Sequence, residues 1–455
     1  MYLNMDSESK YSVKIRGKTA SSVISNVVSL GGRNVMQIKI GTEENKSIKP
    51  IDGENLAAAA KIAHEQGMPL ICFVESSGAD ILEGVAAVHG WGTAAREFVR
   101  CSGKVPVIFC VTGATVSGPA LLLGLADFVI MVDDSYAFVS GPRMAELFTG
   151  ETTNNEDLGG ASLHDRTTGV SHFSVNSLDE GKELIQELLS FLPDNAHQVP
   201  RGWTCDDPPG RSTPEAGAIL PNSISDSYDI RDVINCVVDE NHILESRKNW
   251  APNLITALAS IAGRPIGIVA NQPQSMAGTL DIPASQKGAS FVSFCDSFNL
   301  PLVTFVDTSG FYPGKDLEWR GMIRYGAQMA FAYARATVPR VCLTLRKSYG
   351  GAYIVMDSRH MGNDLMLAWP SAEIAVMGAK GAVEILHRDA SDEEKLSLEN
   401  SYEEKLLNPF VAAERGSVDR VIEPSETRAE IASALELLSE KKERLPKRKH
   451  DNIPL

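Results

Sequence analysis

A chain of 455 residues, 43% hydrophobic and 22% charged, has the composition of a globular protein and enough length for two or three domains. The formal net charge of −15 argues against nucleic acid as the main partner, because phosphate binding needs a basic surface. The seven cysteines include no CxxC pair, so neither a zinc ribbon nor a thioredoxin-like site is indicated.

The first half of the chain alternates strand and helix patterns. Residues 1–14 are polar and lack the apolar core of a signal peptide, and no segment has the apolar length of a membrane helix. We therefore expect a cytoplasmic protein with no membrane partner.

An alanine-rich helix is predicted in the first half of the chain at 52–66, with Asp52 as its candidate N-cap. The other predicted elements are strands at 35–40, 69–74, 105–111, 126–132 and 137–139 and a helix at 84–100.

A more polar region follows these elements. Residues 141–160 are predicted to be mainly loop. His164 and His172 lie eight residues apart without a third ligand, so hydrogen-bonded loop histidines are favoured over a metal site, and no metal is predicted. After an amphipathic helix at 178–191, the composition of 193–227 is that of an interdomain linker.

The second half, from residue 228, repeats the alternation of strands and helices, which predicts a layered α/β fold throughout. Its predicted strands are at 265–271, 301–306, 338–345 and 370–377, and its predicted helices are at 281–298, 321–336 and 426–444.

The two halves also resemble each other directly. The sequence PLICFVESSG at 69–78 matches PLVTFVDTSG at 301–310, an offset of 232 residues. Further along, Ser117-Gly118 matches Gly350-Gly351 at an offset of 233. Two long collinear copies predict a duplicated domain with one glycine turn in each copy.

The second glycine turn follows a predicted buried strand and precedes a segment suited to a helix, which exposes backbone N–H groups that can bind an oxyanion. A single turn of this kind is more often a steric requirement, but two copies suit a reaction with one oxyanion on each of two substrates. The chain has no GxSxG elbow, no Walker A motif and no dinucleotide fingerprint. Backbone-amide stabilisation of a thioester enolate remains the favoured chemistry.

Several long motifs in the second half resemble the carboxyltransferase (β) subunits of biotin-dependent acyl-CoA carboxylases, most closely the propionyl-CoA carboxylase type. The motifs are APN at 251–253, IVANQP at 268–273, RKSYGGAY at 346–353, LAWPSAEIAVMGA at 367–379, GAV at 381–383, ILHR at 385–388 and HDNIPL at 450–455. The resemblance extends from about residue 69 to the C-terminus.

The resemblance implies two tandem crotonase-like (ClpP/crotonase) ββα spiral domains. The N-terminal domain, 1–227, would bind acyl-CoA, and the C-terminal domain, 228–455, would bind carboxybiotin. The family further implies a hexamer, a trimer of dimers, because each site joins the N-terminal domain of one chain to the C-terminal domain of another.

Site residues carry over from the resemblance in two groups. The backbone N–H groups of Ser117 and Gly118 would hold the thioester enolate oxygen, and those of Gly351 and Ala352 the ureido oxygen of biotin. Freed biotin would remove the α-proton, so no side-chain base is needed. The residues expected to bind substrate are Ser77, Gly78, Ala79, Tyr353 and Ile354.

Two positions depart from the family pattern, and a third has two interpretations. Ser117 replaces a glycine and adds a Cβ that restricts positive φ. Asp80 replaces an arginine in a turn whose Gly-Ala-Asp-Ile sequence resembles that of crotonases, where an alanine N–H polarises the thioester carbonyl. Ile354 either lines the acyl pocket or packs in the core.

The chain has neither a Met-Lys-Met biotinylation site nor a glycine-rich ATP grasp, so carboxybiotin must arrive on a separate carrier. The expected partner is an α subunit with biotin carboxylase and biotin carboxyl carrier functions. The expected reaction moves a carboxyl group from carboxybiotin to the α-carbon of a short-chain acyl-CoA, propionyl-CoA or acetyl-CoA. Two alternatives are the same subunit in an acyl-CoA decarboxylase and a non-catalytic structural homologue.

Overall fold

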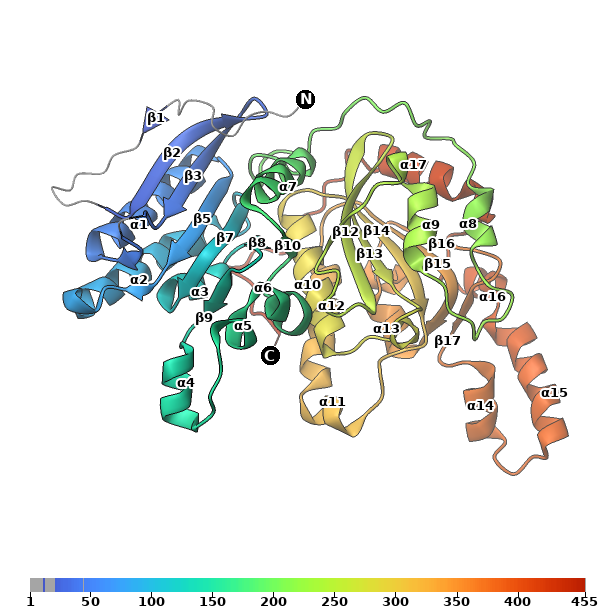
Figure 1. Ribbon diagram of the computed structural model, residues 1–455. Helices are drawn as coiled ribbons and strands as arrows, with labels where there is room; N and C mark the ends of the chain where they lie inside the picture. The colour runs from blue at the N-terminus through green and yellow to red at the C-terminus, as the bar shows by residue number, and fades with distance from the viewer. Residues whose placement is uncertain (1–10, 13–20, 44, 455) are drawn as a thin grey trace. The chain divides into compact units, whose positions relative to one another are not determined.

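The computed structural model describes residues 11–12, 21–43 and 45–454 (Figure 1). Apart from residues 11 and 12, the polar N-terminal stretch 1–14 lies outside the described residues. The chain divides into two compact units, Met1–Pro200 with Arg247–Trp250, and Arg201–Ser246 with Ala251–Leu455. Residues 201–227 pack with the second unit, and the functional boundary at 227/228 stays a prediction.

The first unit is built on one eight-stranded sheet in the order β1-β2-β3-β5-β7-β8-β10, with β9 paired to β7. β4 and β6 form a separate parallel pair. The strands are β1 (Tyr11–Ser12), β2 (Val23–Leu30), β3 (Arg33–Ile40), β4 (Ser47–Ile48), β5 (Leu70–Ser76), β6 (Gly78–Ala79), β7 (Val107–Val116), β8 (Phe128–Val132), β9 (Tyr136–Phe138) and β10 (Phe173–Val175). The helices are α1 (Pro50–Gln66), α2 (Val85–Cys101), α3 (Gly118–Leu123), α4 (Pro142–Thr149), α5 (Asn155–Gly159), α6 (Ala161–Leu163) and α7 (Leu178–Phe191).

The second unit has a sheet of the same order, β11-β12-β13-β14-β15-β16-β18, with β17 paired to β15. Its strands are β11 (Leu244–Ser246), β12 (Leu254–Ile261), β13 (Arg264–Asn271), β14 (Leu302–Thr308), β15 (Arg340–Tyr349), β16 (Leu365–Ala368), β17 (Glu373–Ala375) and β18 (Arg420–Val421). Its helices are α8 (Pro214–Ala218), α9 (Ile230–Val237), α10 (Ile282–Ser297), α11 (Lys315–Trp319), α12 (Met322–Arg335), α13 (Gly350–Val355), α14 (Ala379–Leu386), α15 (Asp392–Tyr402), α16 (Pro409–Glu414) and α17 (Thr427–Leu437).

The strand-for-strand match between the two sheets confirms the predicted duplication. Both sheets also have the same irregularity, a shift in the parallel register before Ser76 in β5 and before Thr308 in β14. A bulge at this place redirects the end of the strand. The glycine turns of the two repeats therefore start from equivalent strand ends.

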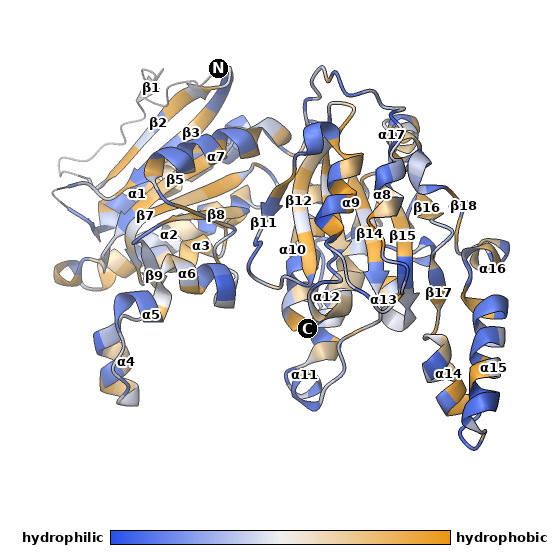
Figure 2. Ribbon diagram, turned by 45° about the vertical axis from the view of Figure 1, so that its right-hand side comes forward, coloured by the Kyte–Doolittle hydropathy of each residue, from blue (hydrophilic) through white to orange (hydrophobic). Residues whose placement is uncertain are grey.

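Each unit has its own apolar core. In the first unit, α1 and α2 pack against β3, β5 and β7, and α7 packs against β7, β8 and β10. In the second, the hydrophobic residues of β12, β14 and β15 are covered by α10 and α12 on one side and by α9 and α17 on the other (Figure 2). Strands covered on both faces explain the unbroken apolar runs in the sequence.

Most predicted elements are confirmed, and three predictions are wrong. Asp52 is not the N-cap of α1: it lies one turn in, where its carboxylate accepts from the Lys49 N–H (2.8 Å) and the Ser22 N–H (2.7 Å). Residues 141–160 are not mainly loop, because Pro142 starts α4 and the Asn154 side chain caps α5. The last helix, α17, ends at Leu437 rather than at residue 444.

His164 and His172 are hydrogen-bonded, as predicted. His164 lies 2.7 Å from Thr168 Oγ1 through Nδ1 and 2.7 Å from the Ala137 carbonyl through Nε2. The ring of His172 accepts from the Val129 N–H at 3.1 Å. Across the part of the chain that the structure describes, no cluster of three metal-ligating side chains occurs. Nor is any helix among those residues long and apolar enough to cross a bilayer.

Candidate active site

The first glycine turn joins β7 to α3. Thr115 in β7 pairs with the middle residue of β9, as Ser348 in β15 pairs with the middle residue of β17. This register makes Ser117 the equivalent of Gly350, and their φ angles agree at 63° and 62°. A serine therefore occupies a backbone conformation that favours glycine.

Gly118, the next residue, is required by close packing. A Cβ on Gly118 would lie 2.7 Å from the indole of Trp91. As the first residue of α3, Gly118 has an N–H without an intrahelical acceptor, and Pro119 has no N–H at all.

The N–H of Ser117 is already used within the sheet, where it donates to the Phe138 carbonyl at 2.9 Å. The prediction that the N–H groups of Ser117 and Gly118 both donate to the enolate oxygen therefore needs correction for Ser117. It failed because β9 meets Ser117 only in the folded sheet. Gly118 remains the candidate donor of this turn.

The turn at 77–79 lies beside the first glycine turn, as the resemblance implied. Gly78 has a φ of 95°, and a Cβ there would lie 3.3 Å from both Ser117 Cβ and the Val116 carbonyl oxygen. The Ser76 hydroxyl accepts from the Gly78 N–H at 3.1 Å, which fixes the turn. The structure thus brings Ser77, Gly78 and Ala79 together with Ser117 and Gly118 within the first unit.

Asp80, which replaces a family arginine, has a local role. Its carboxylate accepts from the Leu82 N–H at 3.0 Å and caps the short 3₁₀ turn Ile81–Glu83. The Ser47 hydroxyl also donates to it at 3.3 Å. The acid therefore stabilises the loop that follows Ala79.

We expect Ser117→Gly to stabilise the fold by about 1 kcal/mol. A non-glycine residue in such a strained region costs about 1–3 kcal/mol, and the greater freedom of glycine in the unfolded chain offsets about 0.5–1 kcal/mol of the gain. Urea unfolding would measure the change. Asp134→Gly is the matched control, because Asp134 has a φ of 64°, and aspartate tolerates that conformation better than serine. A loss of stability in Ser117→Gly would contradict the strain argument.

The second glycine turn joins β15 to α13. Gly350 has a φ of 62°, and a Cβ on Gly351 would lie 3.3 Å from the ring of Phe311. Because α13 starts at Gly350, the N–H groups of Gly350, Gly351 and Ala352 have no intrahelical acceptors. Ala352 is fully buried beneath the turn.

A buried ion pair fixes the strand before this turn. Asp307 in β14 accepts from Arg346 Nε at 2.8 Å and from the Tyr228 hydroxyl at 3.0 Å. The guanidinium of Arg346 also lies over the Tyr228 ring, 4.7 Å from its centre. Burial, and then the nearby carboxylate of Asp307, raise the pKa of Tyr228 well above its usual value. The phenol therefore stays a hydrogen-bond donor.

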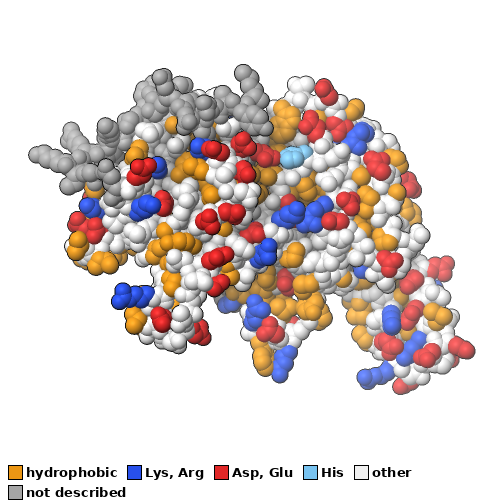
Figure 3. All heavy atoms as spheres, in the orientation of Figure 1, with side chains coloured by type: hydrophobic (Ala, Val, Ile, Leu, Met, Phe, Trp, Pro, Cys, Tyr) orange, Lys and Arg blue, Asp and Glu red, His pale blue; other side chains and the backbone are white. Residues whose placement is uncertain are grey.

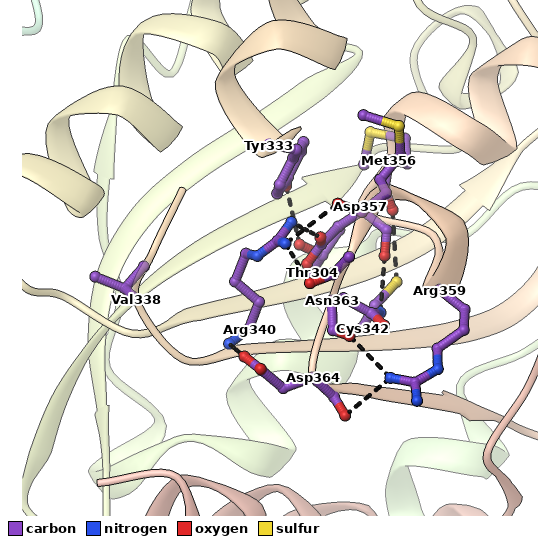
Figure 4. A network of polar contacts seen from close by, with 12 residues as sticks. Thr304, Tyr333, Val338, Arg340, Cys342, Met356, Asp357, Arg359, Asn363 and Asp364 are labelled. Atoms are coloured by element: carbon purple, nitrogen blue, oxygen red, sulfur yellow. Dashed lines mark hydrogen bonds and ion pairs between the residues drawn. The ribbon is translucent and has the colours of Figure 1, made fainter. Parts of the chain in front are cut away.

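A second buried network fixes the other end of α13 (Figure 4). Arg340 in β15 donates to the Asp357 carboxylate at 2.6 Å, and Asn363 donates to the Asp357 carbonyl at 2.9 Å. Burial raises the pKa of Asp357 to about 6, and Arg340 opposes that rise. The short helix with the glycine turn is thus held before its first residue and after its last.

Two pockets of the second unit flank the residues that follow the turn. One, of about 580 Å³, is lined mainly by apolar residues, among them Ile354, and also by Gly351, Tyr353, Arg415 and Ser417. The other, of about 480 Å³, also includes Gly351 and Ile354 but is almost entirely apolar. Ile354 is 36% exposed. Its position on the walls of both pockets favours the interpretation as a pocket residue over a core residue.

Phe311 is a site residue that the sequence reasoning missed. It occupies the position in the second repeat that Ala79 occupies in the first, one residue after the matched glycine. Its ring lies against Gly351 and lines the apolar pocket. Extending the alignment of the repeats by one residue would have identified it.

Two repeated α/β units, each with a glycine turn at the end of a buried strand, define a crotonase-like fold. The chain belongs to the carboxyl transferase domain family, whose model matches residues 4–453. It is therefore an enzyme of the carboxyltransferase type, which confirms the resemblance seen in the sequence.

Relatives and solved structures agree with this assignment. The chain is 44% identical to the propionyl-CoA carboxylase beta chain of Saccharopolyspora erythraea, over 90% of this chain and 78% of that protein. It is 41% identical to the methylmalonyl-CoA decarboxylase subunit alpha of Veillonella parvula, over 91% of this chain and 81% of that protein. The transcarboxylase 12S structure, a hexamer with methylmalonyl-CoA and methylmalonic acid bound, has a TM-score of 0.93 and 40% identity, covering 95% of this chain and 85% of that one.

Proposed function

We propose that the chain is the carboxyltransferase subunit of a biotin-dependent acyl-CoA carboxylase, acting on a short-chain acyl-CoA such as propionyl-CoA or acetyl-CoA. The observation that carries this proposal is the retention of a glycine turn at the equivalent place in both repeats, with Gly118 and Gly351 at matching positions. A structural homologue without activity would have no need for both turns.

The second unit fits the biotin side of the reaction. Its pocket of about 580 Å³ is lined in part by Gly350 and Gly351 and is roomy enough for a bicyclic ureido ring. The N–H groups of Gly351 and Ala352 would donate to the ureido oxygen, and Tyr353 would line the pocket. Carboxybiotin, delivered by a separate carrier, supplies CO₂ and the base that takes the α-proton.

The first unit fits the acyl-CoA side. The N–H of Gly118 would donate to the thioester oxygen, where negative charge grows as the α-proton leaves. We propose the N–H of Ala79 as its second donor, because the 77–79 turn packs against Ser117 and because its sequence resembles the crotonase turn. Pre-aimed N–H groups stabilise the enolate without any side-chain base on this chain.

The direction of the reaction has a second candidate. A 41% identical relative is named as a decarboxylase subunit, so the same transfer could run from a carboxylated acyl-CoA to biotin. A carboxylase would work with an α subunit that has biotin carboxylase and carrier functions, whereas a decarboxylase would work with a membrane partner. Incubation with a biotinyl carrier and methylmalonyl-CoA, against carboxybiotinyl carrier and propionyl-CoA, would compare the two directions.

We expect the protein to assemble as a hexamer, because the proposed site needs the acyl-CoA side of one chain and the biotin side of another. Analytical ultracentrifugation at micromolar concentration should give six times the chain mass of 49.1 kDa. A monomer that retains carboxyl transfer would contradict this assembly.

Replacing Ile354 by aspartate should change the choice of acyl-CoA. An apolar wall stabilises an alkyl tail by about 0.8 kcal/mol per buried methylene, and a carboxylate removes that contribution. We expect the relative rate with propionyl-CoA over acetyl-CoA to fall, with little loss of thermal stability because Ile354 is partly exposed. Ile385→Asp is the control, at a position 68% exposed on α14. A large loss of stability with unchanged relative rates would make Ile354 a core residue.

A further inference from the structure

An aromatic ring lies against the second residue of each glycine turn. In the first unit, the three atoms nearest to a Cβ on Gly118 would all belong to the indole of Trp91, at 2.7, 2.8 and 2.9 Å. In the second unit, the atoms nearest to a Cβ on Gly351 would belong to the ring of Phe311, at 3.3 and 3.6 Å. Each ring therefore occupies the space that a side chain would need at the residue whose N–H is the proposed oxyanion donor.

The two rings do not come from equivalent positions of the repeats. Phe311 directly follows the matched glycine of the second repeat, and Ala79 holds that place in the first. Trp91 lies on α2, and the offset of 232 or 233 residues places its counterpart on α12, at Ile323 or Arg324. Duplication alone would have left both rings at one position. Their separate origins indicate that the turn itself requires a ring at its second residue.

The indole of Trp91 is the reason that position 118 must be glycine. Gly118 is the first residue of α3 and its φ is not positive, so its backbone conformation is one that other residues adopt. The obstacle to a Cβ is the ring, which approaches more closely than any real Cβ contact allows. Glycine at this place therefore serves the close approach of Trp91.

Trp91 is not needed to fill the core of the first unit. The buried face of α2 on either side of Trp91 includes three small residues, Ala87, Gly90 and Ala94. The indole at the edge of this face is partly exposed. The first turns of α2 are open to solvent, with Val85 68% and Val88 49% exposed. Hydrophobic side chains accordingly reach the surface at the left of the view in Figure 3, where Figure 1 places α2.

A ring in this place affects the Gly118 N–H in two ways. It restricts a peptide group that has no side chain of its own to anchor it, so the N–H keeps one direction. It also excludes water from one side, and a hydrogen bond to a growing negative charge is stronger where water is excluded. Because the Ser117 N–H donates to the Phe138 carbonyl and Pro119 has no N–H, Gly118 is the only donor that residues 117–119 can offer.

We propose that Trp91 is a positioning residue of the acyl-CoA site, whose indole ring holds the Gly118 N–H toward the thioester oxygen and shields it from water. Phe311 has the same role for Gly351 in the second unit. This inference rests on the proposed function and adds a residue to its acyl-CoA side. Trp91 exchanges no proton with the substrate and forms no bond to it, because it acts through Gly118.

Steady-state kinetics of the hexamer with its carboxybiotinyl carrier and propionyl-CoA provide the first test. Trp91→Ala should lower kcat about tenfold, less than the about 10²–10³-fold of a lost donor, and should change KM less than about twofold. Trp91→Phe keeps a ring beside Gly118, so its kcat should stay within about threefold of the parent value.

Trp203→Ala is the matched control for these kinetics. Trp203 is 40% exposed, and its N–H donates to the Gly263 carbonyl just before β13. The glycine turn of that unit instead follows the end of β15, and both strands are parallel to β14, so Trp203 lies at the opposite edge of the sheet. Its replacement should leave kcat and KM unchanged.

A paired substitution tests the contact itself. Gly118→Ala adds a Cβ 2.7 Å from the indole, so the N–H must move and kcat should fall about tenfold or more. Trp91→Ala vacates the space that this Cβ needs. The double variant should therefore have a higher kcat than Gly118→Ala alone, and the two losses should not add.

Hydrogen exchange gives a readout that does not depend on turnover. Since the Ser117 N–H is bonded within the sheet and Pro119 has none, exchange across residues 117–119 reports mainly on Gly118. In the hexamer without substrate, Trp91→Ala should speed that exchange at least about tenfold, and Trp91→Phe should speed it less.

Three outcomes would overturn the inference or its basis, and they differ from one another. Additive losses in the double variant, or parent values of kcat and of Gly118 exchange in Trp91→Ala, would remove the role given to Trp91. Faster exchange throughout the first unit of Trp91→Ala would make Trp91 a core residue instead. Absence of carboxyl transfer by the parent complex would contradict the proposed function, and the exchange of Gly118 would still decide whether Trp91 shields it.

Discussion

Gly351→Pro should reduce carboxyl transfer by about 10²–10³-fold while the protein stays folded. Proline removes the N–H proposed to donate to the ureido oxygen, and the loss of one oxyanion donor costs about 2.7–4 kcal/mol in the transition state. Gly351 is the second residue of α13, where an N–H has no intrahelical acceptor, so the helix itself loses no hydrogen bond. Steady-state rates with carboxybiotinyl carrier and propionyl-CoA would measure the effect.

Gly351→Ala separates the missing N–H from the added bulk. Alanine keeps the N–H and adds a Cβ 3.3 Å from Phe311, a contact that the ring can relieve by a small shift. We expect the alanine variant to retain most of its activity, and both variants to show the same circular dichroism and sedimentation as the parent protein. Near-normal turnover in a folded Gly351→Pro variant would remove this N–H from the mechanism.

Asp307→Ala should destabilise the second unit by about 3–5 kcal/mol, the cost of leaving a buried charge without its partner. The side chains of Asp307 and Arg346 are nearly inaccessible to solvent, at 0% and 3% exposure, and 2.8 Å separates their charged atoms. The same substitution leaves the Tyr228 hydroxyl without its acceptor. Because Arg346 lies in β15 four residues before Gly350, loss of activity should accompany the loss of stability.

Chemical unfolding of three variants would test this prediction. Asp307→Ala and Arg346→Leu should each be strongly destabilised, and the double variant should be less destabilised than the sum of the two. Asp316→Ala is the control, because Asp316 pairs with Arg320 at the exposed surface of α11, where such a pair contributes about 0–1 kcal/mol. A cost below about 1 kcal/mol for Asp307→Ala would contradict the role given to the buried pair.

The fold could be predicted from the sequence because its signals are local or repeated. The strands covered on both faces, such as β5 and β14, read as unbroken apolar runs, and two copies of such a run revealed the duplication. The glycine turns were found for the same reason, since Gly118 and Gly351 occupy matching places in the two copies. Ser117, at the glycine-favouring φ of 63°, was also anticipated as a strained departure.

The features that could not be predicted from the sequence depend on contacts between distant segments. The N–H of Ser117 is engaged because β9 returns to the sheet beside it, and nothing near Ser117 in the sequence indicates that. The apolar pocket of about 480 Å³ depends on Phe311, which lies against Gly326 and Gly351 only in the folded chain. The prediction of a mainly loop region at 141–160 failed because its polar and glycine-rich composition concealed the proline that starts α4 and the asparagine that caps α5.

Transfer of a labelled carboxyl group from carboxybiotinyl carrier to propionyl-CoA, with the purified hexamer as catalyst, tests the central claim most directly. We expect the labelled carboxyl group to appear on the α-carbon of the acyl-CoA, and to appear far more slowly with Gly351→Pro. Release of the label as CO₂ at the rate seen without protein, with no labelled acyl-CoA formed, would contradict it.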